Sequence, residues 1–402
     1  MCQNNNNTTK GFSPADRLKS VNEYYFSRKG KEIARLNAEG KDIVSLAIGS
    51  PDMPPSQATV DELCRVAKLP DAHGYQPTVG TPELRTAMAK WYKRWFDVDL
   101  DPASEIQPLI GSKEGILHVT LTFVNPGEKV LVPNPGYPTY TSLSKLLGAQ
   151  VVNYNLRPDN GWQPDFEELE NMDLDGVRLL WCNYPNMPTG ANARRETYER
   201  LVDFARRHGI IVVNDNPYSF ILNEHPISIL QVPGAKECCI EFNSMSKSHN
   251  MPGWRVGLAA TNAEFISWIL KVKSNIDSGT FRALQLAAAK AYDNDAAWHH
   301  EANIEVYSRR RNIAEQIMEA LGCEYDRKVW QCRGTYRTSA ARSTCVYNTR
   351  VHFRVERRKV RQNIALRQRR KDGRSIKTDK GNKTINKKQN GTGITETEPA
   401  GC

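Results

Sequence analysis

One lysine in this sequence has the surroundings of a reactive amine. Residues 243–257 read NSMSKSHNMPGWRVG and directly follow the β-rich run CCIEF. Lys247 is flanked by small hydroxyl residues, and Arg255 follows eight positions later. A lysine held at the end of a strand can act as a covalent nucleophile, and the arginine can anchor an anion beside it. The pattern therefore predicts amine chemistry at Lys247, although an isolated Ser-Lys pair is more often an ordinary surface loop.

Other polar residues also follow β-rich runs. Asp215 lies in VVNDNPY, where a buried carboxylate is costly unless it has a partner. The segment GSKEG at 111–115 opens a helical pattern, so its free N–H groups can receive a phosphate. The segment NPGYPTY at 134–140 follows another run, and its Tyr140 is interpreted as a packing residue. Ligands in parallel α/β folds gather at the carboxyl ends of the strands, so these segments are expected to share one site.

The elements that must position these residues alternate along the chain. Short β-rich runs are separated by helical patterns such as PELRTAMAKWYKRWF and ETYERLVDFARRHG. Continuous Val/Ile-rich runs between helices predict an α/β fold with a buried, mostly parallel sheet and helices on both faces. The β-rich runs are VSLAIG, EKVLVPNP, VRLLWCNYP, GIIVVNDNPY, CCIEFNSMS and RVGLAATN. Residues 14–40 are expected to form a helical arm, and 262–290 and 296–322 two long helices.

The net charge of +10 over 402 residues is concentrated at one end of the chain. Of 55 basic and 45 acidic side chains, 21 and 5 lie from Arg327 onward, which leaves 34 and 40 in residues 1–326. The basic tail has no helix-turn-helix pattern and no aromatic residue after Phe353, so nucleic acid is not the expected partner.

Several other classes of protein are disfavoured by composition. No apolar run approaches the length of about 18 residues that a membrane helix needs. The polar start MCQNNNNTTKG does not resemble a signal peptide, so a cytoplasmic protein is expected. Nine cysteines without a C-x-x-C pair argue against a zinc site, and no metal is expected.

The segment around Lys247 resembles the S-x-S-K-x-x-x-x-x-G-x-R pattern of the class I/II aminotransferases. These fold-type-I enzymes use pyridoxal 5′-phosphate (PLP), and the likeness to their bacterial diaminopimelate and aspartate aminotransferase members covers residues 11–325. The resemblance implies a PLP-dependent transferase-like fold, in which a smaller α/β domain accompanies the large sheet domain. It also implies a homodimer with shared active sites.

The resemblance assigns a role to individual residues of this chain. Catalytic roles fall on Lys247, Asp215 and Tyr218. The implied contacts are Lys247 to PLP as a Schiff base, Ser244, Arg255, Ser112 and Lys113 to its phosphate, Asp215 to its pyridine nitrogen, Tyr218 to its ring oxygen, Tyr137 stacked on its ring, Tyr75 from the partner subunit to its phosphate, and Gly49 to the substrate carboxylate.

Two departures from the family pattern stand out. The family's N-P-T-G asparagine is Met187 here, and a thioether cannot donate its hydrogen bond to the cofactor and substrate. The neighbouring Asn186 is the candidate replacement. The family also carries a C-terminal R-Y/F-V/I-R-I-S strand whose second arginine grips the substrate carboxylate, and no such string occurs in this chain.

A frameshift at or soon after Lys328 is a hypothesis that explains the missing strand. Codons for 358–373 can be chosen so that the next reading frame encodes GRYVRIS, with the arginine encoded across Gln362 and Asn363. The chain would then divide into a disordered start (1–13), an arm (14–45), a large PLP-binding domain (46–295), a helix of an incomplete small domain (296–326) and a disordered basic tail (327–402). Low solubility and little activity are expected.

The function expected from the resemblance is PLP-dependent transfer of an amino group from an L-amino acid to a 2-oxo acid. Two alternatives stay open. One is a C–S (β) lyase or a decarboxylase of the same fold, since the lysine and aspartate motifs do not separate these reactions. The other is a PLP-binding regulator without enzymatic activity, which could use the basic tail on nucleic acid.

Overall fold

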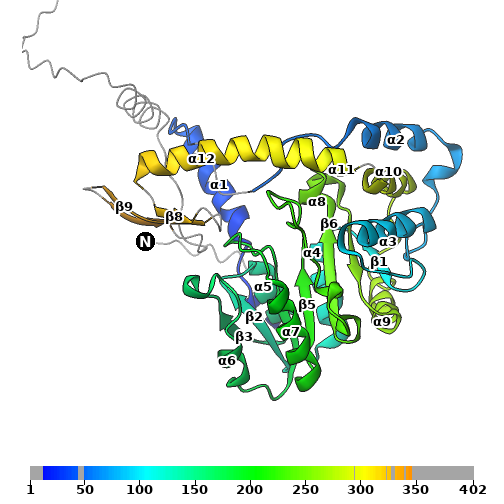
Figure 1. Ribbon diagram of the computed structural model, residues 1–402, viewed down its shortest axis with the longest axis horizontal. Helices are drawn as coiled ribbons and strands as arrows, with labels where there is room; N and C mark the ends of the chain where they lie inside the picture. The colour runs from blue at the N-terminus through cyan, green and yellow to red at the C-terminus, as the bar shows by residue number, and fades with distance from the viewer. Residues whose placement is uncertain are drawn as a thin grey trace, which may run out of the picture.

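A seven-stranded sheet forms the centre of the molecule (Figure 1). The computed structural model describes residues 12–43, 49–293, 295–322, 324–326, 331–338 and 341–345. The strands follow the order β1-β7-β6-β5-β4-β2-β3, and all neighbours from β6 to β3 are parallel. Only β7 runs against its two neighbours. The strands are β1 Ile106–Leu109, β2 Lys129–Asn134, β3 Gln150–Asn155, β4 Val177–Cys182, β5 Ile211–Asp215, β6 Cys239–Ser244 and β7 Gly257–Ala260.

Helices cover both faces of this sheet, as the alternation of buried residues requires. Along β4, Leu180 packs into one core while its neighbours Leu179 and Trp181 pack into the other. The first core includes residues of α3 and α7, and the second includes residues of α4, α5 and α9. The predicted α/β fold with a mostly parallel sheet is confirmed. The helices are α1 Tyr25–Ala38, α2 Gln57–Ala67, α3 Pro82–Phe96, α4 Ser112–Phe123, α5 Pro138–Leu146, α6 Phe166–Glu170, α7 Arg195–His208, α8 Met245–Ser248, α9 Ala263–Lys273 and α10 Arg282–Asp293.

A long helical run leads away from the sheet toward the C-terminal strands (Figure 1). It consists of α11 (Asp295–Trp298), a π-helix η7 (His299–Val306) and α12 (Tyr307–Leu321), which ends at Gly322 with a φ of 70°. The sequence predicts one helix over 262–290, whereas the structure has α9 and α10 with a loop between them. That loop contains Ser278, Gly279 and Thr280, which disfavour a continuous helix.

The expectation of no regular structure beyond Asp326 is wrong for two segments. Strands β8 (Glu324–Asp326), β9 (Gln331–Thr338) and β10 (Ala341–Cys345) form an antiparallel three-stranded sheet. The tail was expected to be disordered because its sequence lacks apolar periodicity. Backbone hydrogen bonds can nevertheless pair strands that contain Thr and Tyr. The remaining part of the tail, with Gln362 and Asn363, lies outside the described residues.

The N-terminal arm is shorter than predicted. A 3-10 helix η1 (Asp16–Ser20) precedes α1, and the chain turns at Gly40 with a φ of 76°. Most of the β-rich run VSLAIG and most of residues 1–13 lie outside the described residues. Among the helices described, none is long and apolar enough to cross a membrane. The division into domains stays a prediction.

Candidate active site

Lys247 lies on α8, a single helical turn directly after β6. The turn begins at Ser244, whose hydroxyl accepts a hydrogen bond from the N–H of Ser246 at 3.2 Å. The Nζ of Lys247 donates to the carbonyl of Gly49 at 2.6 Å, which brings two predicted residues together. Burial, and then the nearby charge of Arg255, lowers the pKa of Lys247. The amine is therefore easier to deprotonate than that of a solvated lysine.

Asp215 ends β5, the strand next to β6, and its side chain is buried. Its Oδ2 accepts a hydrogen bond from the hydroxyl of Tyr140 at 2.8 Å, whereas its Oδ1 has no hydrogen bond within the part of the chain that the structure describes. Burial raises the pKa of Asp215 to about 6, although the Tyr140 and Ser112 hydroxyls oppose the shift. A buried carboxylate oxygen without a donor is the arrangement expected where a cationic or N–H ligand group belongs.

Tyr140 does more than pack, which corrects the sequence-based interpretation. Its ring stacks on Trp181 at 5.1 Å with an interplanar angle of 7°, and this stacking fixes the hydroxyl against Asp215. The sequence contains no signal for this pairing, because 75 residues separate the two partners.

The N-terminus of α4 forms the opposite end of the site. Ser112 is its first residue, preceded by Gly111 with a φ of 77°. The guanidinium of Arg255 donates to the carbonyl of Ile110 at 3.3 Å, and lies so close to Gly111 that a Cβ there would collide with it. Free N–H groups, a helix N-terminus and an exposed arginine together form a site for a phosphate. The predicted set of Ser112, Ser244 and Arg255 is thus gathered around α4 and α8.

Tyr24 of the N-terminal arm interacts with Tyr137 and Tyr218 beside this site. Burial raises the pKa of Tyr24, and so do Tyr137 and Tyr218, which places the three side chains close together. The Nζ of Lys113 lies 4.3 Å from the centre of the Tyr24 ring. Tyr137 and Tyr218 were predicted, but Tyr24 was not, because the arm was interpreted only as an amphipathic helix. Lys113 here contacts the arm.

The turn around Met187 is tied to Asp215 by Asn183. The Asn183 amide donates to the backbone carbonyl of Asp215 at 2.5 Å, and its oxygen accepts from the N–H of Met187 at 2.6 Å. The Oδ1 of the buried Asn186 accepts from the Thr189 hydroxyl at 2.8 Å, which leaves its Nδ2 without a partner. A buried donor without an acceptor is the second open polar group of the site.

Tyr75 stands apart from the other predicted residues. Its side chain is 96% exposed. The chain therefore does not use Tyr75 to complete its own site.

The open groups of the site fit PLP. Asp215 Oδ1 could pair with a pyridinium nitrogen, Asn186 Nδ2 with a ring oxygen, and the α4 N-terminus with Ser244 and Arg255 could hold a phosphate. Lys247 supplies the amine on the turn between these groups.

Comparisons with known proteins show the family of the chain. The family "Aminotransferase class I and II" matches residues 41–334. The chain is 42% identical over 310 residues to an LL-diaminopimelate aminotransferase of Dehalococcoides mccartyi, which covers 77% of this chain and 80% of the relative. It is 42% identical over 315 residues to the enzyme of the same name from Aquifex aeolicus, covering 78% and 81%.

Solved structures also resemble the chain. A probable N-succinyldiaminopimelate aminotransferase from Thermus thermophilus is 28% identical with a TM-score of 0.72, covering 79% of this chain and 86% of that one. An aspartate aminotransferase from the same organism has a TM-score of 0.78 over 88% of this chain and 98% of that one, and at 22% identity it bears on the fold alone. The chain therefore belongs to the class I and II aminotransferases.

Proposed function

We propose that this aminotransferase holds PLP between Lys247 and Asp215 and moves an amino group from an LL-diaminopimelate-like donor to a 2-oxo acid. The observation that carries the proposal is the pair of neighbouring strand ends. Lys247 follows β6 on α8, and Asp215 ends the adjacent β5 with one carboxylate oxygen open.

Each residue then has a defined task. PLP, when bound, supplies an electron sink for negative charge developing at the substrate Cα. Asp215 accepts a hydrogen bond from the protonated ring nitrogen and thereby keeps that nitrogen cationic. Lys247, with its lowered pKa, would take a proton from the substrate Cα and deliver it to the cofactor carbon that receives the amino group. Ser112, Ser244 and Arg255 fix the phosphate, so the ring cannot turn away from the amine.

The donor is proposed from the curated relatives. Both enzymes named above are LL-diaminopimelate aminotransferases, and about four fifths of each aligns with this chain at 42% identity. A lyase or decarboxylase of the same fold would release a different product from the same donor. Product analysis after incubation with LL-diaminopimelate and 2-oxoglutarate separates these reactions.

Binding of PLP is tested by the visible absorption band of the lysine-bound cofactor. Lys247→Ala should lose this band, because the amine of Lys113, the other lysine assigned to the site, lies against the Tyr24 ring. Lys236→Ala is the matched control, since this half-buried lysine pairs with Glu105 at 2.8 Å and contacts none of the site residues. Retention of the band in Lys247→Ala would refute the proposal.

Turnover is proposed to be slow, because the sequence lacks the arginine strand that grips the substrate carboxylate in the family. A hydrogen bond to a charged group contributes about 1.5–3 kcal/mol, so restoring the strand should raise kcat/KM by about 10- to 100-fold. The experiment replaces residues 329–402 with the corresponding segment of a curated relative. Equal kcat/KM before and after the exchange would contradict this part of the proposal.

A homodimer is proposed from the exposed apolar surface around Tyr75. Ile276 is 50% exposed and Phe281 is 41% exposed, and both flank Gly279, which pairs with Gln76 next to Tyr75. An exposed aliphatic and aromatic patch of this kind favours burial against another protein surface. A second copy of the chain would receive Tyr75 at the phosphate of its cofactor.

Mixing two variants tests the shared site. Lys247→Ala removes the amine, and Tyr75→Ala should weaken PLP binding. A mixed dimer contains one site with Lys247 from one chain and Tyr75 from the other, so tight binding with the visible band should return on mixing. Failure of the band to return at low PLP concentration, with dimers present by light scattering, would exclude sharing.

A further inference from the structure

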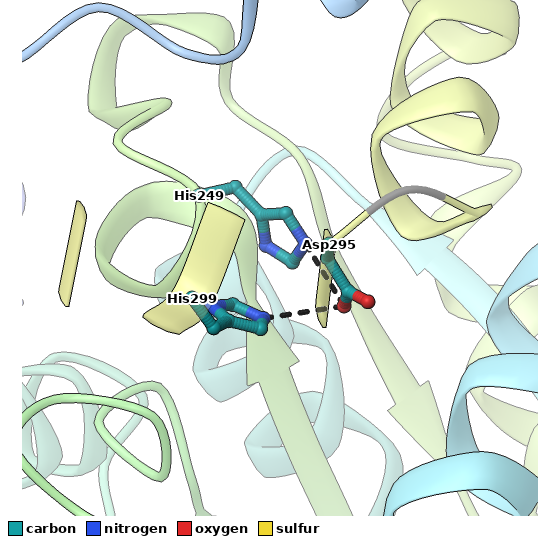
Figure 2. A group of neighbouring side chains, drawn as sticks. All are labelled: His249, Asp295 and His299. Carbon is teal, nitrogen blue, oxygen red and sulfur yellow. Dashed lines mark hydrogen bonds and ion pairs between the residues drawn. The ribbon is translucent and has the colours of Figure 1, made fainter. Parts of the chain in front are cut away.

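We propose that Asp295 is a positioning residue for Lys247 and acts on it through His249. The proposal rests on the proposed function, in which Lys247 is the reacting amine. It concerns a buried cluster in which side chains from α3, the loop after α8, and the α11–η7 helical run meet at one carboxylate (Figure 2).

The carboxylate of Asp295 is fully buried and surrounded by N–H donors. Its Oδ1 accepts from the guanidinium of Arg94 at 2.7 Å. Its Oδ2 faces the indole N–H of Trp91 in a short hydrogen bond and that of Trp95 at 3.3 Å. The Nε2 of His299 lies 3.2 Å from the same oxygen.

His249 completes this cluster. Figure 2 shows both imidazole rings pointing toward the Asp295 carboxylate, with the Nε2 of His249 3.4 Å from Oδ2. This contact is long for a hydrogen bond, and the buried Nε2 has no closer partner among the described residues. The His249 ring is therefore held between the hydroxyl of Ser248, 2.7 Å from its Nδ1, and the carboxylate of Asp295, which faces its Nε2.

A metal ion is disfavoured in this cluster, although two histidines and an aspartate are a possible ligand set. The lone pairs of the carboxylate are already directed at Arg94 and at two indole N–H groups. The guanidinium charge also repels a cation at this distance. The cluster is better suited to fixing side-chain orientation by hydrogen bonds.

The charges of the cluster determine the tautomer of His249. Burial lowers the pKa of His249 to about 4, so the ring is neutral at pH 7. Burial alone would raise the pKa of Asp295, but contacts with His249 and His299 hold it well below its ordinary range. A neutral imidazole carries one N–H, and the anionic Asp295 favours that hydrogen on Nε2, the nitrogen that faces it. The Nδ1 lies 2.7 Å from the hydroxyl oxygen of Ser248, which also donates to the carbonyl of Ser244 at 3.2 Å.

The orientation of His249 affects Lys247 because the two residues belong to the same short turn. Ser248 follows Lys247 directly, and the N–H of His249 donates to the carbonyl of Met245 at 3.2 Å, which closes the turn. A helix of four residues has no stability of its own, so its geometry depends on its neighbours. By holding His249, Asp295 fixes the end of the turn that carries the amine.

The same helical run contacts the surroundings of Lys247 at two further points. The hydroxyl of Tyr307 donates to Asn250 at 3.1 Å, one residue beyond His249. Arg310 pairs with Asp52 at 2.6 Å, on the segment whose Gly49 carbonyl accepts from the Lys247 amine. One continuous run over 295–321 therefore contacts the segments on both sides of the amine.

The test uses the protein without PLP, so its outcome does not depend on the proposed function. Acetylation of Lys247 is followed against pH by peptide mass spectrometry, which gives the pKa of this one amine. In Asp295→Asn the turn should loosen and admit water. The pKa should then rise by about half a unit or more toward the value of about 10.4 for a solvated lysine. His249→Leu should reproduce the rise.

Glu241→Gln is the matched control, because Glu241 is an equally buried carboxylate that does not contact α8. It accepts hydrogen bonds from Ser228, Asn214, Tyr92 and the N–H of Ile229. Global unfolding in urea is measured for every variant. A Lys247 pKa that moves no further in Asp295→Asn than in Glu241→Gln, with both variants folded, would overturn the proposal. If the Lys247 pKa rises in Asp295→Asn as expected, but the unchanged protein shows no PLP band, the result would count against the proposed function alone.

Discussion

Two buried aspartates of this protein have opposite surroundings. Asp215, at the carboxyl end of β5, receives one hydrogen bond from Tyr140 and keeps its Oδ1 open. Asp295, at the start of the helical run, meets donors from Arg94, two tryptophans and two histidines. Burial raises the pKa of Asp215 to about 6, whereas the donors around Asp295 outweigh burial and lower its pKa. The proposed cofactor ligand is thus the aspartate with an open oxygen, whereas the carboxylate of Asp295 already has donors on both oxygens.

Glu241 refines this comparison. It is fully buried and accepts four hydrogen bonds, yet burial still raises its pKa. Its donors are hydroxyl, amide and backbone groups, whereas Asp295 also faces the charged guanidinium of Arg94. The type of donor, and not only the number, thus decides which buried carboxylate is a stable anion.

The largest effect is expected on PLP binding when the open carboxylate is removed. Asp215→Asn cannot pair with a cationic ring nitrogen, and breaking a buried ion pair costs about 3–5 kcal/mol. The dissociation constant for PLP should therefore rise by about two to three orders of magnitude, measured by titration of the visible band. Asp295→Asn should change this constant by less than about tenfold. Equal losses in the two variants would remove the distinction between the two aspartates.

The second effect concerns the free energy of unfolding without cofactor, which Asp215→Asn and Asp295→Asn should change in opposite directions. The pKa of Asp215 is raised from 3.8 to about 6, so its folded state binds the proton more tightly, and stability falls as pH rises from about 4 to 6. Above pH 6 this penalty is about 3 kcal/mol. Asp215→Asn should remove it. Asp295→Asn should instead cost about 3 kcal/mol, because Arg94 loses its buried partner.

Urea unfolding at two pH values checks this pair of predictions. The advantage of Asp215→Asn over the unchanged protein should be greatest at pH 7.5 and shrink at about pH 5, where Asp215 is largely protonated. The deficit of Asp295→Asn should persist at both values, since its lowered pKa keeps the carboxylate ionised. An Asp215→Asn protein less stable than the unchanged one at pH 7.5 would contradict the comparison.

The sequence predicts the ligand-binding aspartate more readily than the saturated one. Asp215 follows a Val/Ile-rich run that is recognisable as a strand, and parallel strands bring their carboxyl ends to one edge. Asp295 lies among helical residues, and its donors come from 91–95, 249 and 299, which no local pattern connects. Contacts between distant helices depend on packing angles, which sequence periodicity does not specify.

The arm and the tail mark two further limits of prediction. Tyr24 reaches Lys113 because α1 begins beside the N-terminus of α4, a placement that the helical pattern of the arm does not indicate. In the tail, β9 and β10 pair through backbone hydrogen bonds without an apolar alternation to reveal them. Polar candidate site residues at strand ends could be predicted from the sequence, whereas contacts that depend on long-range packing could not.

A smaller effect is expected from removing the Tyr140 hydroxyl that donates to Asp215. Tyr140→Phe removes the hydroxyl but keeps the ring on Trp181, so Asp215 loses its bond at 2.8 Å and its pKa should rise further. A hydrogen bond contributes about 1 kcal/mol, and PLP affinity should fall by about fivefold to tenfold. The loss should be greater at pH 6 than at pH 8, where Asp215 stays ionised. The same loss at both pH values would mean that Tyr140 acts by packing alone.

The smallest effect is expected at Met187, beside the second open group of the cofactor site. If Asn186 Nδ2 already serves the ring oxygen, Met187→Asn should leave PLP affinity unchanged. We expect this outcome, because the N–H and hydroxyl of Thr189 hold the Asn186 oxygen and leave its Nδ2 open. Met187→Leu is the control without a donor and should match the unchanged protein. Asn186→Ala separates the cases further, since a large loss there, with no gain in Met187→Asn, would show that Asn186 has taken over the missing hydrogen bond.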